Sequence, residues 1–130
     1  MKIFDTDKNL IAVFNRYKDI ENSKNFLTEN KNEFQFGTFN LEKGEEIKRH
    51  IHNEQPRNIY STSEAIVVLD GSLKVSFFDK DKKFVDDLIL NKNDSLLILS
   101  GGHSIDVLED TKFVEFKQGP YIEEIDKEYF

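Results

Sequence analysis

The alternation of apolar and polar residues predicts short strands over most of the chain. From about Phe34 onward, apolar runs of five to seven residues are separated by turn-forming Gly, Pro, Asn and Asp residues. Strands of this length at even spacing are typical of antiparallel sandwiches and barrels. We therefore expect an all-β fold with eight strands, over Gln35–Leu41, Ile47–His52, Glu64–Leu69, Leu73–Phe78, Phe84–Leu90, Ser95–Leu99, Ser104–Leu108 and Lys112–Lys117.

Two of these segments carry further information. Ala65–Leu69 and Ser95–Leu99 are apolar at nearly every position. Such strands are normally covered on both faces, as in a double-layered barrel or at a subunit contact. Asp70-Gly71 separates two predicted strands, which indicates a two-residue hairpin with positive φ at both turn positions.

The first 33 residues are harder to assign. Leu10–Phe14 is rich in β-branched and aromatic residues, which favours a further strand over a helix across Asp5–Lys18. Asp19–Asn25 is polar and is predicted to be a loop or a short helical turn. We expect a single domain over residues 1–130, with an N-terminal arm or extra strand at 1–33, a barrel at 34–118 and a C-terminal tail at 119–130.

Composition narrows the classes of function. Eighteen basic residues against 25 acidic residues give a net charge of −7, and nucleic-acid binding needs clustered Lys and Arg. The absence of cysteine excludes disulfides, zinc fingers and a cysteine nucleophile. Leu10–Phe14, the longest apolar stretch near the N-terminus, is too short for a leader or a membrane span. We expect a cytoplasmic protein with no nucleic-acid or membrane partner.

The three histidines of the chain are the main candidates for chemistry. His50 and His52 stand at i and i+2 of a predicted strand, so their imidazoles leave from one face, close enough to chelate one ion. Ile47 and Ile51 then face the other way and are expected to pack. A pair of partly exposed surface histidines is the alternative for this motif on its own.

Glu64 and His103 lie at the ends of other predicted strands. A carboxylate turned inward at Glu64 needs a partner, because unpaired burial is costly. His103 follows Gly101-Gly102, which let the backbone turn tightly and approach another element. An exposed glutamate and a loop histidine are the alternatives. Three imidazoles and one carboxylate suit one divalent metal ion, Fe, Mn, Ni, Cu or Zn, with open positions for water or substrate.

The spacing of these residues resembles the first motif of the cupin superfamily. That motif has a Gly, five residues, His-x-His, a short gap, a Glu, six residues and a Gly. The matching residues are Gly44, His50, His52, Glu64 and Gly71. Eleven residues separate His52 from Glu64, several more than is usual, and Glu54 within this gap is an alternative carboxylate ligand.

A second cupin motif is resembled by Asn93-Asp94, the strand SLLIL, Gly101-Gly102 and His103, with Ser100-Gly101 where a proline is usual. The resemblance implies a cupin-type double-stranded β-helix, or jelly-roll, barrel. It also implies that His50, His52, Glu64 and His103 bind one divalent metal ion.

A wider resemblance covers nearly the whole chain. The stretches LSGGHSIDVLED and EFKQGPYIEEIDKEYF are similar to a bacterial subfamily of small cupins whose genes often lie beside genes for polysaccharide or sugar-nucleotide biosynthesis. This implies a sugar or sugar acid as the small-molecule ligand, and a homodimer.

Four further residues are candidates for roles around the site. Arg57 can hold a carboxylate or phosphate in a two-pronged grip, with a solvated loop arginine as the alternative. Tyr60 is a candidate proton donor, or a packing residue. Gln118 and Tyr121 flank the turn signal Gly119-Pro120, so the tail either reaches back over the barrel mouth or packs as an ordinary terminus.

Three functions follow as expectations. The first is a metal-dependent enzyme of isomerase, epimerase or dioxygenase type, with Arg57 and Tyr60 in catalytic roles. The second is a metal-free sugar-nucleotide ketoisomerase in which His50 or His52 is the base. The third is a non-catalytic module that binds a metabolite.

Overall fold

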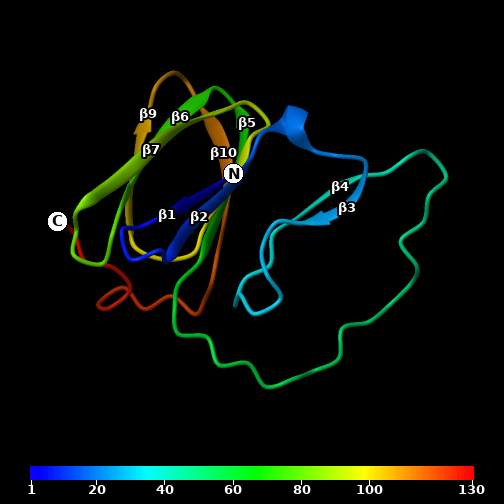
Figure 1. The fold of residues 1–130 in the computed structure, drawn as a ribbon, viewed down its shortest axis with the longest axis horizontal. Coiled ribbons are helices and arrows are strands. Elements are labelled where there is room, and N and C mark those ends of the chain that lie inside the picture. Colours follow the sequence, from blue (N-terminus) through cyan, green and yellow to red (C-terminus); the bar gives the residue numbers. More distant parts are fainter.

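The structure consists of two antiparallel sheets and a separate hairpin (Figure 1). The computed structural model describes residues 1–130. The larger sheet has the order β1 (Lys2–Phe4), β2 (Leu10–Asn15), β8 (Ser95–Ile98), β5 (Glu64–Asp70) and β10 (Lys112–Lys117). The smaller sheet has the order β7 (Phe84–Asn91), β6 (Ser72–Phe78) and β9 (Gly102–Val107). The hairpin is formed by β3 (Ser23–Phe26) and β4 (Gly37–Asn40), and η1 (Tyr17–Asp19) is a single 3₁₀ turn. No helix is long and apolar enough to cross a membrane.

The main core lies between the inner faces of the two sheets. Ile66 and Leu96 of the larger sheet join Val75, Phe77 and Leu90 of the smaller sheet in one buried cluster. Burial of each such side chain contributes about 1.5–3 kcal/mol. Alternation along β6 explains the arrangement, because its buried apolar residues alternate with half-buried residues that point outward.

A second apolar cluster covers the outer face of the larger sheet. Val13 and Leu97 belong to the sheet, and Leu27, Phe34 and Phe36, from the connection between β3 and β4, pack against them. The prediction that the strand at Ser95–Leu99 is covered on both faces is confirmed, and the cover comes from the chain itself. For Ala65–Leu69 the same prediction holds only in part, because Leu69 is 50% exposed.

Most of the predicted strands are present. Seven of the eight predicted segments contain a strand, and Leu10–Phe14 is also a strand, as its composition favours. The prediction for Asp19–Asn25 is wrong in its second half. Residues Ser23–Asn25 belong to β3 and pair with β4, which supplies the hydrogen-bond partners that a polar strand needs.

The predicted hairpin at Asp70-Gly71 is wrong. β5 pairs with β8 and β10, whereas β6 pairs with β7 and β9, so the two strands lie in different sheets. Only Gly71 has a positive φ, of 82°. Asp70-Gly71 is therefore a corner at which the chain crosses from one sheet to the other.

The predicted strand at Ile47–His52 is not formed. Residues 41–63 contain no strand and form a long connection that projects away from the two sheets (Figure 1). Ile47 and Ile51, expected to pack, are 53% and 86% exposed. A strand needs a hydrogen-bonded neighbour, and this segment has none, although the outer edges of β9 and β10 are both unpaired.

Candidate functional site

Three polar side chains face the interior at one end of the sandwich. Glu64 lies opposite Ile98 on one side and Lys117 on the other, and Ile98 is buried in the main core. His103 lies opposite Phe77, which is also in that core. Directly opposed residues of antiparallel strands share a face, so Glu64, Lys117 and His103 all turn inward. Both sheets therefore contribute to one site.

Glu64 and His103 form the central contact. His103 Nε2 lies 3.0 Å from Glu64 Oε2, and the two side chains are 26% and 13% exposed respectively. Hydrogen bonding from His103 holds the pKa of Glu64 below its ordinary value, with the nearby Lys117 ammonium acting in the same direction and burial opposing both. Glu64 is therefore ionised at neutral pH.

Lys117 joins this pair to the C-terminal segment. Its Nζ lies 2.6 Å from Asp126 Oδ2 and 3.4 Å from Glu64 Oε1. The hydrogen bond to Asp126, together with the charge of Glu64, raises the pKa of Lys117. An ammonium held between two carboxylates remains charged at every physiological pH.

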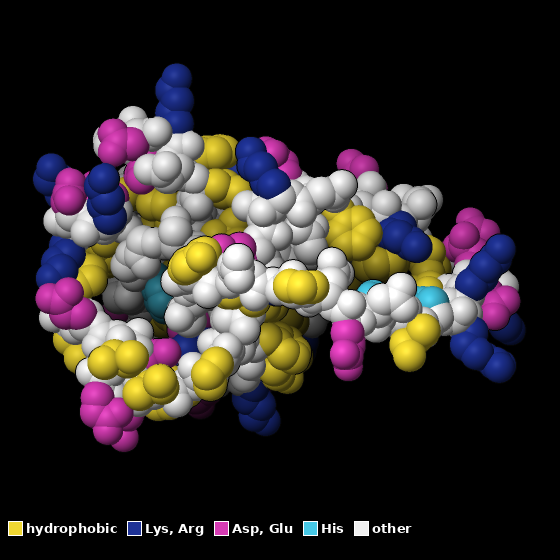
Figure 2. Space-filling model, turned by 90° about the horizontal axis from the view of Figure 1, so that it is seen from below, with side chains coloured by type: hydrophobic (Ala, Val, Ile, Leu, Met, Phe, Trp, Pro, Cys, Tyr) yellow, Lys and Arg dark blue, Asp and Glu magenta, His cyan; other side chains and the backbone are white.

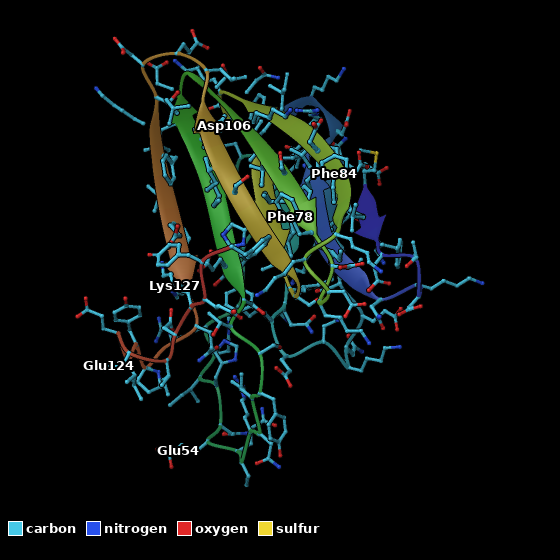
Figure 3. All side chains as sticks on the ribbon, turned by 90° about the vertical axis from the view of Figure 1, so that its left-hand side faces the viewer. Glu54, Phe78, Phe84, Asp106, Glu124 and Lys127 are labelled. Atoms are coloured by element: carbon cyan, nitrogen blue, oxygen red, sulfur yellow. The ribbon has the colours of Figure 1, made fainter.

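These residues line a cavity of about 530 Å³. Only three of its 14 lining residues are hydrophobic, two are glycines, and the other nine offer hydroxyl, carboxylate, imidazole and ammonium groups. Residues Asp126–Phe130 of the C-terminal segment form part of the wall, and Lys127 lies near the end of β10 (Figure 3). A polar cavity of this size suits a small metabolite with many hydrogen-bonding groups.

His50 and His52 lie outside this cavity. Their rings are neighbours, with centroids 5.1 Å apart, but both residues are exposed on the projecting connection. The cyan side chains of histidine accordingly appear in two separate regions of Figure 2, in a hollow of the main body and on the projecting part. The structure brings Glu64 and His103 together, and it does not bring His50 and His52 to them.

Of the four other residues expected around the site, two lie on the projecting connection and two follow the end of β10. Arg57 and Tyr60 are exposed on the projecting connection, and neither lines the cavity. The Tyr60 backbone amide donates to Glu33. Gln118 donates from its backbone amide to Ser63, which fixes the point where the tail leaves β10. Tyr121 lies beside Lys117, whose Nζ is 5.0 Å from the centre of its ring.

As arranged, these residues do not form a complete metal site. No group of three or more His, Cys, Asp or Glu side chains is close enough to bind one ion. Glu64 and His103 supply two ligands, whereas a structural or catalytic transition-metal site in proteins uses three or four. The Lys117 ammonium, 3.4 Å from Glu64, also supplies the positive charge that a metal ion would otherwise place beside that carboxylate.

Lys117 and Asp126 are site residues that the sequence did not reveal. For Lys117 the sequence offered only a weak indication of such a role. It is the last residue of the predicted strand Lys112–Lys117 and shares a face with Phe113 and Glu115. Asp126 lies in the acidic stretch Glu123–Glu128 and had no distinguishing signal. No family model, curated protein or solved structure matches the chain.

Proposed function

We propose that the cavity binds a small polar metabolite, such as a sugar or sugar acid, and that Glu64 and His103 transfer a proton on it in an isomerase or epimerase reaction. The observation that carries this proposal is the contact of 3.0 Å between His103 Nε2 and Glu64 Oε2 inside a cavity lined mainly by polar residues. The two antiparallel sheets packed over one core also support a cupin jelly roll as the finer description of the fold.

The chemistry follows from the orientation of the imidazole. Nε2 faces Glu64, so the proton on Nε2 is directed to the carboxylate and Nδ1 is the nitrogen left to accept a proton from a ligand. The negative charge of Glu64 then stabilises the imidazolium that forms. A positioned base of this kind accelerates removal of a proton next to a carbonyl by about 10²–10⁴-fold.

Exchange with deuterated water tests this proposal. The wild-type chain, incubated with a panel of aldoses, ketoses and uronic acids, is expected to introduce deuterium next to the carbonyl of its substrate. His103→Asn should lower the exchange rate at least about 100-fold, because it removes the base. His52→Asn is the matched control and should leave the rate unchanged.

The outcomes separate the proposal from its alternatives. Exchange that survives His103→Asn and is lost in His52→Asn would contradict it and support the ketoisomerase that uses the His-x-His pair. Binding of a sugar without any exchange would support the non-catalytic module.

A divalent metal site formed by His50, His52, Glu64 and His103 is a second proposal, and it requires the projecting connection to move. The metal-site proposal is supported by the unpaired outer edge of β9, the strand that contains His103, because a free edge is a template for another strand. Eleven residues between His52 and Glu64 span roughly 40 Å when extended, so the chain length allows the movement.

Titration with Zn²⁺ and with Mn²⁺ tests the metal site. If all four ligands converge, His103→Asn and the double variant His50→Ala, His52→Ala should each weaken binding at least about tenfold. If the exposed His50–His52 pair binds the ion alone, His103→Asn will leave the affinity unchanged, and the four-ligand proposal is then wrong.

A further inference from the structure

Asp126 is the most buried residue of the C-terminal segment 119–130. Its side chain is 8% exposed and its carboxylate lies 2.6 Å from Lys117 Nζ. The large apolar residues of the same segment face solvent, with Ile125 76% and Tyr129 87% exposed. Hydrophobic burial would give the opposite orientation. The most buried side chain that the segment presents to the cavity is therefore a carboxylate.

The rest of the segment is attached at the rim of the cavity. Lys82 pairs with Glu128 at 2.7 Å, with both side chains well exposed, and exposed ion pairs contribute little to stability. The Phe130 ring packs edge-on against Phe78, and a Cβ atom at Gly102 would lie 2.8 Å from it. None of these contacts belongs to the main core, so the segment can leave the cavity while the two sheets stay intact.

We infer that Asp126 occupies a carboxylate subsite, in which Lys117 binds the acid group of the metabolite after Asp126 has moved away. This inference rests on the proposed function and names the class of ligand as a small monocarboxylic acid, such as a sugar acid. Lys117 is then the residue that determines this specificity, and Asp126 is an internal competitor of the ligand.

Charge balance selects an acid over a neutral sugar. When Asp126 leaves, the Lys117 ammonium keeps Glu64 as its only carboxylate partner, at 3.4 Å. A ligand carboxylate restores the second partner, whereas a neutral hydroxyl group does not. The ammonium is a compact charge that binds oxyanions well.

The other charges of the cavity select a single negative charge. Glu115 and Glu128 also line it, with Lys127 as the only further cation. A phosphate ester, with about two negative charges at neutral pH, would be repelled by these carboxylates more strongly than a carboxylate would be. The subsite therefore favours a carboxylic acid over a phosphate.

Calorimetric titration with D-glucuronate and with D-glucose tests the inference. Asp126→Asn removes the competing charge and keeps the size of the side chain. Glucuronate should therefore bind to this variant at least about fivefold more tightly than to the wild type. Glucose affinity should not change. Glu124→Gln is the matched control, because it removes one charge from the same segment away from the strands (Figure 3), and it should leave both affinities within about twofold.

Lys117→Gln provides an independent variant. It should abolish the preference for glucuronate over glucose, and heteronuclear NMR spectra of every variant verify the fold. If glucuronate does not bind Asp126→Asn, or binds it no better than Glu124→Gln, while glucose binds, the subsite inference is wrong and the proposed function stands. If neither compound binds any form of the protein, both fail together.

Discussion

At the scale of single residues, Asp94 connects parts of the chain that are far apart in sequence. Its carboxylate contacts Arg16 at 2.6 Å and accepts hydrogen bonds from the backbone amides of Tyr17 and Asn91. The side chain is 6% exposed, so water cannot replace these partners. The residue thus holds the N-terminal arm against the turn between β7 and β8.

We predict that Asp94→Ala lowers the free energy of unfolding by about 3 kcal/mol, because it removes the ion pair with Arg16 and leaves two backbone amides without their acceptor. Urea denaturation followed by circular dichroism measures this loss. Asp87→Ala is the control, since Asp87 pairs with Lys74 at an exposed position, and its cost should stay below about 1 kcal/mol. Equal costs for the two variants would show that Asp94 has no special role.

Glu64 gives a prediction about pH. Its pKa in the folded protein lies below the ordinary value of 4.5, mainly because His103 donates a hydrogen bond to it. A lowered pKa stabilises the folded state above about pH 4.5, and this stabilisation is lost as the pH falls through the lower folded pKa. Glu64→Gln should therefore cost about 1–2 kcal/mol at pH 7, and its difference from the wild type should shrink in unfolding curves taken towards pH 3. A difference that is constant with pH would contradict this assignment.

At the scale of elements, the corner between β5 and β6 depends on a glycine. Gly71 has a φ of 82°, and a Cβ atom there would lie 2.5 Å from the Asp110 carbonyl oxygen and would also meet Thr111. Thr111 Oγ1 both accepts from and donates to the backbone of Ser72. The corner and the β9–β10 turn are therefore packed together without room for a side chain.

Alanine substitutions at two glycines separate backbone strain from steric conflict. Gly71→Ala should destabilise the protein by at least about 2 kcal/mol more than Gly44→Ala. Gly44 has a similar φ of 99°, but a Cβ atom there meets nothing within 4 Å. Positive φ alone costs an alanine roughly 1–2 kcal/mol, so the excess at Gly71 measures the clash. Thermal unfolding of both variants gives the comparison, and equal losses would rule out a steric role for the corner.

At the scale of the whole molecule, part of the outer face of the larger sheet remains uncovered. Val114 and Phe116 of β10 lie opposite Val67 and Ala65 on this face, and they are 38% and 55% exposed. Leu69, on the same face of β5, is 50% exposed. The connection between β3 and β4 packs over the β2 and β8 side of the sheet, so Val114, Phe116 and Leu69 form a separate apolar surface.

The homodimer expected from the sequence stays a prediction, and this surface is where we place its contact. Phe116→Glu should raise the dimer dissociation constant at least about tenfold, because it puts a charge into an apolar contact. Sedimentation velocity of the wild type and the variant measures it, with Ile51→Glu, on the projecting connection, as a control that should have no effect. A wild-type chain that is monomeric throughout would contradict the prediction.

Much of the fold was predictable because strand formation has a local signal. The alternation in Leu73–Phe78 and the apolar runs around Val67 and Leu97 identify strands whatever their neighbours are. The candidate site was predictable only in part. Glu64 and His103 were recognised by type and position, whereas the contact between Lys117 and Asp126 joins an ordinary strand end to an acidic stretch without any motif.

The sequence by itself determined that the chain is all-β, where most strands begin and end, and that Glu64 and His103 are candidates for one site. Only the tertiary structure decided that Asp70-Gly71 is a corner between sheets, that Ile47–His52 forms no strand, and that Asp126 enters the cavity. The physical reason is that side-chain alternation and turn residues act within a few positions, whereas strand pairing depends on partners far along the chain. Ion pairs such as that of Lys117 with Asp126 depend in turn on where those partners place each segment.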